Sequence, residues 1–513
     1  MANDCVVETT GGPVRGTDLG PFGVRAWKGI RYAAAPVGDL RFRAPEPPEP
    51  HRDVFDATVY GPACPQPQLP RMPLELGARQ GEDCLRLNIW APADAGAAKP
   101  VLVWLHGGAY ILGSGSQQLY DGSVLAGTGD VVVVTINYRL GALGFLDLSS
   151  FSTPRRRFDS NIGLRDVLAA LAWVRDNIAA FGGDPDRVTI FGESAGAGLV
   201  TTLLATPAAE GLFAGAIAQS SPATSVYDRE RGRQMAAFIL DRMGIDVCDV
   251  ERLQDAPVAA LLAASKEAFD EVPVRNPGTL AFVPIVDGDV LPDYPVKVAQ
   301  EGRSLPVPLI IGTNRNEAAL FRLMRSPLMP ITPRGITSMF TQIAAEQPDL
   351  QLPTREQLHA AYAGLRRKAA MLSIATDVGF RMPSVWLAEG HSAVAPVYLY
   401  RFDYSTPLFK LLLVRAAHAT ELPYVWGTLG APGDPTLKLG GAKTAKAVSQ
   451  RLRTRWINFA THGKPSGPAG EPDWSSYQAA DRACLVIGAR DAIVRDVDAG
   501  IRAAWGDAVV SFR

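Results

Sequence analysis

A serine flanked by glycines gives the clearest chemical signal in the sequence. Residues 192–196 (GESAG) fit the pattern G-x-S-x-G, with Ser194 at the centre. An apolar run, 188–191 (VTIF), precedes the pattern, and a helix-compatible run follows it. This strand–turn–helix setting is typical of a nucleophile elbow, and glycines suit it because side chains would collide in so tight a turn. We therefore predict that Ser194 presents a nucleophilic hydroxyl at the top of a sheet.

A second glycine-containing loop lies upstream of the serine. Residues 106–110 (HGGAY) directly follow the apolar run 101–105 (VLVWL). The backbone N–H groups of such a loop can turn toward the nucleophile. Together with the N–H of Ala195, they can bind the oxyanion of an acyl-transfer intermediate. The loop therefore predicts an oxyanion hole beside Ser194.

A serine nucleophile needs a general base, and the base needs an orienting carboxylate. Because an elbow of this kind is followed first by the acid and then by the histidine, His51 and His106 are excluded as the base. His418 lies in a loop, 416–423, that leads into an apolar segment, and this position favours it. The other histidines fall in a charged helical stretch or in polar loops, where we expect them to be solvated: His359, His391 and His462.

The identity of the acid stays open at this level. Candidates between Ser194 and His418 are Asp287, Asp289, Glu317 and Asp403. Glu317 follows an apparent strand after a short Asn-rich turn, which is where catalytic acids of such a fold lie. Asp403, at another strand end, is the alternative, whereas Asp287 and Asp289 have the surroundings of a turn.

The rest of the chain must supply the strands and helices that position these groups. Stretches of helical pattern interrupt the core at about 225–280 and 334–395, and we interpret residues 1–513 as one domain in which these insertions cover one face of the site. Apolar spacings of three and four over 164–181 predict a helix, which Gly182 and Gly183 end. Continuous apolar runs predict strands buried on both faces in a doubly wound α/β sheet: 101–105, 131–136, 188–191, 215–219, 308–312 and 396–403.

Composition excludes several classes of protein. Lys and Arg total 51 and Asp and Glu total 52, so the net charge is −1 and there is no basic excess of the kind that nucleic-acid binding requires. The first residues lack the pattern of a signal peptide, and no run of about 18 apolar residues predicts a membrane span. These features predict a protein with no nucleic-acid partner and no membrane span, which is cytoplasmic, or secreted if a leader has been removed.

Taken together, the motifs resemble those of the type-B carboxylesterases, and the similarity covers nearly the whole chain. It is carried by residues 27–33 (WKGIRYA), 82–89 (EDCLRLNI) and the stretch from 181 (FGGDP) through 196, with further matches near 282–288 and 456–465. The resemblance implies the α/β-hydrolase fold, with a mostly parallel sheet flanked by helices. It also implies hydrolysis of carboxylic esters to acid and alcohol.

The resemblance also implies a role for each candidate residue. Loop 312–317 is similar to the loop that carries the family's acid, so Glu317 takes that role and His418 is the base. The oxyanion donors would be the N–H groups of Gly108, Ala109 and Ala195. Ser220 matches a serine that supports the catalytic histidine, and Glu193 matches a buried carboxylate behind the nucleophile.

The sequence departs from the family pattern at a few positions. Ala109 replaces a glycine of the oxyanion loop, which keeps an N–H donor but narrows the space on the alcohol side. Ala318 and Arg415 replace glycines beside the acid and the base. Cys64 and Cys84 match a disulfide that is common in secreted members; five reduced thiols are the alternative.

The implied mechanism is a two-step acyl transfer through an acyl-enzyme on Ser194, with a small-molecule ester as the substrate and with neither a metal nor a cofactor. Three alternatives stay open: a lipase, an amide or carbamate hydrolase with the same triad, and a non-catalytic binding member of the family. For the cavity wall we expect contributions near Tyr110, Phe321 and Phe409.

Overall fold

The computed structural model describes residues 5–20, 23–70, 74–94, 96, 98–432 and 434–513. Its strands are β1 (Val6–Thr9), β2 (Gly12–Arg15), β3 (Thr17–Asp18), β4 (Val24–Arg31), β5 (Phe55–Asp56), β6 (Arg86–Pro92), β7 (Lys99–Leu105), β8 (Val132–Ile136), β9 (Gly183–Glu193), β10 (Gly215–Gln219), β11 (Leu309–Asn314), β12 (Val397–Phe402), β13 (Ala483–Ile487) and β14 (Ala492–Arg495).

The α-helices are α1 (Ser123–Gly129), α2 (Gly141–Phe145), α3 (Ile162–Asn177), α4 (Ala195–Leu203), α5 (Arg229–Arg242), α6 (Val258–Arg275), α7 (Pro295–Gln300), α8 (Ala318–Met324), α9 (Pro333–Glu346), α10 (Arg355–Ala361), α11 (Arg367–Thr376), α12 (Met382–His391), α13 (Pro407–Leu411), α14 (Leu422–Trp426), α15 (Ala442–His462) and α16 (Ala499–Trp505). A π-helical turn, η8 (Asp377–Arg381), joins α11 to α12.

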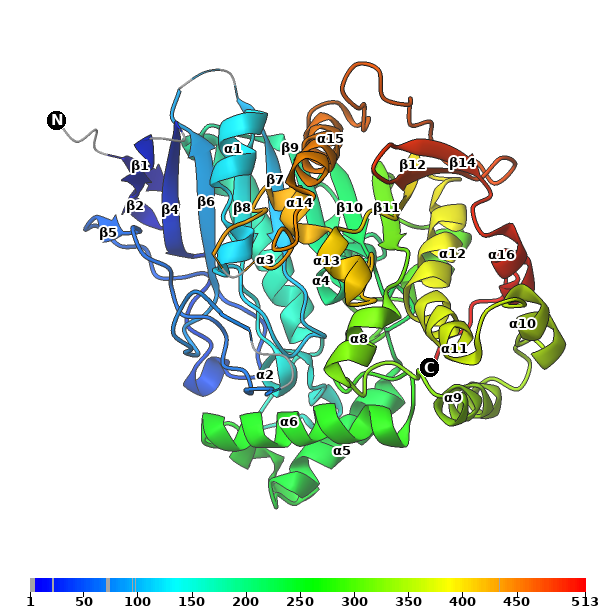
Figure 1. The fold of residues 1–513 in the computed structure, drawn as a ribbon. Helices are drawn as coiled ribbons and strands as arrows, with labels where there is room; N and C mark the ends of the chain where they lie inside the picture. Colours follow the sequence, from blue (N-terminus) through cyan, green and yellow to red (C-terminus); the bar gives the residue numbers. More distant parts are fainter. Residues whose placement is uncertain (1–4, 21–22, 71–73, 95, 97, 433) are drawn as a thin grey trace.

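A large mixed sheet forms the centre of the molecule (Figure 1). In the described residues it has 11 strands in the order β14-β13-β12-β11-β10-β9-β7-β8-β6-β4-β3. The middle of the sheet, from β8 through β13, is parallel, and the strands at both edges pair antiparallel. Since the parallel strands share one direction, their carboxyl ends meet at one edge of the sheet, where an α/β enzyme assembles its site.

Alternate side chains of the central strands enter two different apolar cores, one on each face of the sheet. In β7, Val101, Val103 and Leu105 pack with α3 and α4, whereas Leu102 and Trp104 pack with α14 and α15. A strand buried on both faces needs apolar residues at consecutive positions. This is why the central strands read as continuous apolar runs in the sequence.

The predicted strands and the predicted helix are present. The run 101–105 lies in β7, 188–191 in β9, and 215–219 is β10. The stripe from Leu164 onward forms α3 and a following 3₁₀ turn, after which Gly182 adopts a left-handed φ of 82° and ends the helical segment. The family's α/β-hydrolase architecture is therefore confirmed.

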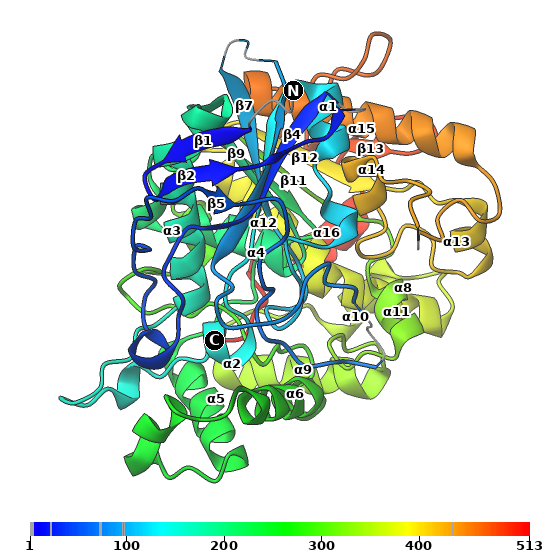
Figure 2. The same ribbon diagram turned by 90° about the vertical axis from the view of Figure 1, so that its left-hand side faces the viewer.

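Parts of the two helical insertions lie beyond one end of the sheet, whereas α12 of the second insertion packs beside β11 and β12. The first contains α5 and α6, and the second runs from α9 to α12. Figures 1 and 2 both place α5, α6 and α9 below the sheet, on the side where β11 continues into α8. Among the described residues, no helix combines the length and apolar character that crossing a membrane requires.

Candidate active site

Ser194 occupies a sharp turn between β9 and α4. Its backbone has φ 57° and ψ −125°, a conformation that a non-glycine residue adopts rarely and at a cost. The surrounding structure holds the turn in place: the Ser194 N–H donates to the Gln219 carbonyl of β10 at 2.9 Å, and the Ser194 carbonyl accepts from the Gly198 N–H at 2.8 Å. The predicted elbow is present.

The glycines of the elbow are required by close backbone contacts. A Cβ atom on Gly196 would lie 2.0 Å from the Leu105 carbonyl oxygen, and one on Gly192 would lie 2.6 Å from the carbonyl carbon of Gly196. Both distances are shorter than any real carbon contact, and the obstacles are backbone atoms. Only glycine lets α4 start this close to the end of β7.

The loop after β7 turns its backbone toward the elbow. Gly108, Ala109 and Tyr110 all have positive φ values, of 121°, 52° and 60°. In the described part of the chain, the N–H groups of Gly108 and Ala109 donate no hydrogen bond, although both residues line the same cavity as Ser194 and Ala195. These amides are therefore available to a ligand, as an oxyanion hole requires.

Glu317 lies in the turn between β11 and α8 and is completely buried. Its Oε1 accepts from the Ser220 hydroxyl at 2.6 Å and from the Asn314 N–H at 2.6 Å. Its Oε2 lies 2.8 Å from Nδ1 of His418. Hydrogen bonds from two neighbouring strands thus fix the carboxylate with one oxygen facing the imidazole. Ser220 contacts the acid, and so supports His418 through Glu317.

The loop that carries His418 is tied to the end of β11 and to the turn that carries Glu317. The Asn316 N–H donates to the Ala416 carbonyl at 2.8 Å, and the Asn314 side chain donates to the Ala417 carbonyl at 2.7 Å. The imidazole packs against the rings of Phe380 and Phe321, with centroids 4.6 Å and 5.1 Å away. The imidazole is therefore held by Glu317 on one edge and by two aromatic rings.

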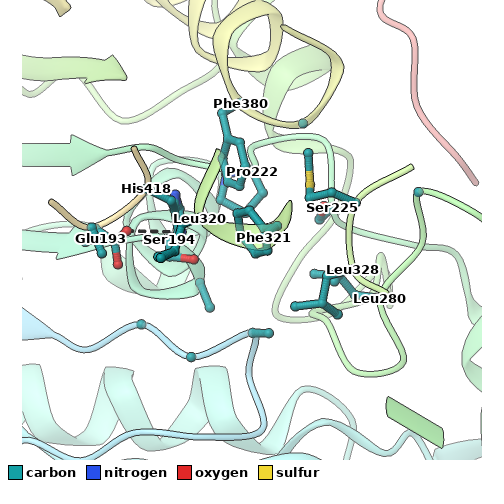
Figure 3. Close-up of a pocket in the computed structure, with 18 of the residues that line it drawn as sticks. Glu193, Ser194, Pro222, Ser225, Leu280, Leu320, Phe321, Leu328, Phe380 and His418 are labelled. Atoms are coloured by element: carbon teal, nitrogen blue, oxygen red, sulfur yellow. Dashed lines mark ion pairs between the residues drawn. The ribbon is translucent and has the colours of Figure 1, made fainter. Parts of the chain in front are cut away.

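The Nε2 atom of His418 stays open toward the site. It lies 3.1 Å from Oε1 of Glu193 (dashed in Figure 3), yet neither atom has a hydrogen-bond partner within the described residues. No hydrogen bond joins Ser194 to His418 in this part of the chain. In enzymes without bound substrate, catalytic hydrogen bonds are often long and tighten only when substrate binds.

Three buried carboxylates surround the imidazole, those of Glu193, Glu317 and Glu421. Burial raises the pKa of Glu193 to about 8, with His418 acting in the opposite direction. Burial also raises the pKa of Glu421, and the nearby Glu317 adds to the effect. For His418, burial lowers the pKa, but Glu193, Glu317 and Glu421 outweigh it and raise the value to about 9. The site thus favours a positively charged imidazole, the form that develops during acyl transfer.

The other acid candidates serve structural roles. Asp287 is buried and accepts hydrogen bonds from Ser160 and Asn161 at 2.6 Å and 2.8 Å. Asp289 pairs with Arg165, and Asp403 pairs with Arg401. Among the candidates, Glu317 is the one whose carboxylate contacts the imidazole of His418.

One of the predictions about the remaining histidines is wrong. His359 and His462 are exposed, as expected, but His391 is fully buried at the end of α12. Its ring nitrogens lie 2.7 Å from the Ser304 hydroxyl and 2.9 Å from the Val307 carbonyl. Polar neighbours in the sequence suggested a solvated loop, whereas these two partners satisfy the ring inside the fold.

A largely apolar cavity of about 340 Å³ opens from Ser194 (Figure 3). The oxyanion loop, the elbow and the base loop form one side. The other side combines α8, the chain after it, η8, α9 and the last described residues: Phe321, Leu328, Met329, Met339, Ile343, Phe380, Val510 and Phe512. Of the predicted wall residues, Phe321 lines the cavity. Tyr110 is instead buried beside Gly198, and Phe409 packs with Val414 and Ala417.

Some residues of the site have no clear signal in the sequence. Phe380 lies on the π-helical turn η8, and such turns often occur at functional sites, but a π turn has no distinctive sequence pattern. Asn314 stands in the Asn-rich turn before Glu317, so its position was visible even though its two contacts were not.

The two cysteines that match a family disulfide are both buried thiols in this structure. The Cys84 thiol hydrogen-bonds to Cys64, and this contact together with burial raises the pKa of Cys84. Cys248, by contrast, is exposed.

Comparisons with known proteins agree with the geometry. A family model described as the carboxylesterase family matches residues 3–502. The para-nitrobenzyl esterase of Bacillus subtilis (strain 168) is 42% identical over 494 residues, which cover 96% of each chain. The acylcarnitine hydrolase of Mus musculus is 36% identical over 94% of this chain and 86% of its own. A solved structure of a PNB esterase superposes with a TM-score of 0.84 at 40% identity, covering 98% of this chain and 100% of that one.

Proposed function

Because this chain belongs to the carboxylesterase family and is a carboxylic ester hydrolase, we propose that Ser194 is its nucleophile, His418 its general base and Glu317 the acid that orients the base. One observation carries the proposal. The chain of contacts Ser220–Glu317–His418 ends at Nε2, which lies 3.1 Å from Oε1 of Glu193 and has no hydrogen-bond partner in the described residues, and His418 lines the same cavity as Ser194.

The reaction then follows from the positions of these groups. Nε2 of His418 takes the hydroxyl proton as Oγ of Ser194 attacks the ester carbonyl carbon. The N–H groups of Gly108, Ala109 and Ala195 bind the oxyanion. The bond to the alcohol breaks and the alcohol leaves with the proton from His418, so that the acyl group stays on Ser194. His418 then takes a proton from water as the water oxygen attacks the acyl carbon; the bond from that carbon to Oγ of Ser194 breaks, Oγ takes the proton back from His418, and the acid leaves.

The lining of the cavity supports uncharged, apolar esters as the substrate class. Among the described lining residues, Glu193 and His418 are the ionisable ones of the Asp, Glu, Lys, Arg and His types, and both lie at the reacting end. A charged group elsewhere on the substrate would lose its water without gaining a counter-ion. Esters with two apolar arms therefore suit the site best.

We also propose that residues 1–513 form one elaborated domain, with the insertions at 225–280 and 334–395 capping the site. Leu280, at the end of the first insertion, and Met339, in the second, both line the cavity. The cytoplasmic location and the lack of a nucleic-acid partner that the sequence suggests stay predictions.

Covalent labelling with a fluorophosphonate probe tests the nucleophile. We expect the wild-type protein to be labelled on Ser194, and the Ser194→Ala variant to be unlabelled and to lose hydrolysis of p-nitrophenyl acetate by at least about 10³-fold. Ser225→Ala is the matched control, because Ser225 lines the same cavity outside the elbow (Figure 3). Folded Ser194→Ala protein that keeps more than a few per cent of the wild-type kcat would refute the proposal.

A further inference from the structure

The last described residues form part of the wall of the cavity that opens at Ser194. Val510, Ser511 and Phe512 line the same cavity as Ser194 and His418. Val510 and Phe512 are buried, and Phe512 is only 5% exposed. They come from a segment that follows α16, far along the chain from the catalytic loops.

This segment packs against the cavity wall supplied by the first insertion. A Cβ atom on Gly278 would lie 2.8 Å from the Met339 sulfur and 3.4 Å from the Phe512 ring. The backbone N–H of Leu280 donates to the hydroxyl of Tyr227 at 2.9 Å. In Figure 3, Leu280 lies with Leu328 on the far side of Phe321 from Ser194. The contact with Gly278 places Phe512 at this remote end of the cavity.

Polar contacts hold the segment in place from outside the cavity. The guanidinium of Arg231 lies between two rings, 4.9 Å from the Tyr227 centroid and 5.2 Å from the Phe512 centroid. Its Nε donates to the Arg513 carbonyl at 2.7 Å. Gln347 donates to the Ser511 carbonyl at 2.7 Å, and Glu346 accepts from the Arg513 N–H at 3.2 Å.

A second hollow of about 230 Å³ lies against the same segment. Thr224 and Ser511 line both this hollow and the catalytic cavity, while Val509 and Arg513 line the hollow alone. The segment therefore separates two spaces. Phe512 lines the catalytic cavity and not the hollow, so removing its ring would enlarge the catalytic cavity itself.

We propose that residues 510–512 form the end wall of the substrate cavity and set the longest apolar arm of an ester that the site accepts. This inference rests on the proposed function, because it takes Ser194 as the point of attack. The arm would be an uncharged hydrocarbon chain or ring, since the residues at this end offer apolar side chains and no charge to the cavity. Arg231 and Glu346, which bind the backbone of Arg513, act as positioning residues for this end wall.

Two variants with opposite effects test the end wall. Phe512→Ala should lengthen the cavity, and Ile343→Phe should shorten it. The measurement is kcat/KM for p-nitrophenyl esters from acetate to palmitate. We expect the ratio of long-chain to acetate hydrolysis to rise at least about fivefold in Phe512→Ala and to fall by a similar factor in Ile343→Phe.

Phe238→Ala is the matched control. Phe238 is also stacked by arginines, with Arg242 at 4.9 Å and Arg275 at 5.8 Å from its ring, but it does not line this cavity. Its chain-length profile should stay that of the wild type. If Phe512→Ala fails to fold, the chain-length profile of Ile343→Phe alone tests the end wall.

The outcomes separate the two proposals. Profiles that match the wild type in every folded variant, with Ser194 still labelled by a fluorophosphonate, would overturn the end wall and leave the catalytic assignment intact. Absence of labelling in folded wild-type protein would overturn the catalytic assignment. A profile that moves equally in Phe238→Ala would also refute the end wall, because the effect would then come from general loosening.

Discussion

The cavity has two walls built on different principles. On one wall, Glu317 and His418 are joined by a hydrogen bond, and Ser220 fixes the far side of the carboxylate. On the opposite wall, apolar side chains such as Phe321 and Met339 contact the cavity by packing alone. The first wall stands on the carboxyl ends of neighbouring strands, whereas the second is assembled from helical insertions and the last described residues.

This difference suggests that the polar wall carries out the reaction, whereas the apolar wall selects the substrate. Hydrogen bonds depend steeply on distance and angle, so the polar wall tolerates little displacement, and the rigid sheet provides that precision. Apolar contact depends mainly on area and shape, so residues of the opposite wall that do not contact His418 can change by substitution without disturbing the reaction. Substitutions should therefore affect the rate of chemistry on one wall and the choice of substrate on the other.

The largest effect should come from neutralising the acid of the polar wall. Glu317→Gln keeps the shape of the side chain but removes the charge that stabilises the imidazolium of His418, and it presents an amide to Nδ1. We expect kcat for p-nitrophenyl acetate to fall by about 10²–10⁴-fold with little change in melting temperature. Asp403→Asn, at the other candidate acid, is the control and should keep kcat. A variant at Glu317 with near wild-type kcat would contradict the assigned role.

A smaller but still severe effect should follow from adding one methyl group to the elbow. In Gly196→Ala the new Cβ would meet the Leu105 carbonyl oxygen at 2.0 Å, so the backbone of either β7 or α4 must shift. We expect a loss of about 2–3 kcal/mol in the free energy of unfolding and at least a tenfold loss of kcat. Denaturant unfolding and steady-state kinetics measure both.

The control for that substitution is Gly500→Ala in α16. Gly500 has no heavy atom within 4 Å of the position of a Cβ, and its φ is not in the left-handed region. Since alanine favours a helix more than glycine does, this variant should be unchanged or up to about 1 kcal/mol more stable. Equal destabilisation of both variants would show that the elbow is not specially constrained.

The polar wall could be predicted largely from the sequence, and the apolar wall could not. The elbow around Ser194 depends on residues adjacent in the chain, and loops after buried strands must meet at one sheet edge, so local patterns indicate the elbow, the 106–110 loop and a set of candidate acids. The family resemblance was needed to single out Gly108 and Glu317. Phe512 reaches the cavity only through the packing of distant segments, which a local pattern does not encode. The burial of His391 escaped prediction for the same reason, because its partners Ser304 and Val307 are remote in sequence.

A moderate effect, on the pH dependence of activity, should follow from neutralising Glu193, the carboxylate next to Ser194. The base must be neutral to accept the serine proton, so activity rises with pH through the pKa of His418. The negative charge of Glu193 favours the imidazolium and so raises that pKa. Glu193→Gln should therefore move the acid limb of the kcat/KM profile to lower pH, by about one unit. A limb that stays in place, or moves to higher pH, would show that Glu193 does not act on His418 by charge.

The smallest effect should come from trimming the apolar wall at Met324. Met324, at the end of α8, lines the cavity and makes no polar contact there. Met324→Ala removes a flexible apolar side chain, so larger esters lose contact area worth about 1–2 kcal/mol while acetate, which does not reach it, loses none. We expect KM to rise by about three- to tenfold for p-nitrophenyl esters of bulky acids, with kcat for acetate and the acid limb both unchanged. A fall in acetate kcat would mean that the two walls are coupled, because trimming an apolar contact would then have displaced His418 through its neighbour Phe321.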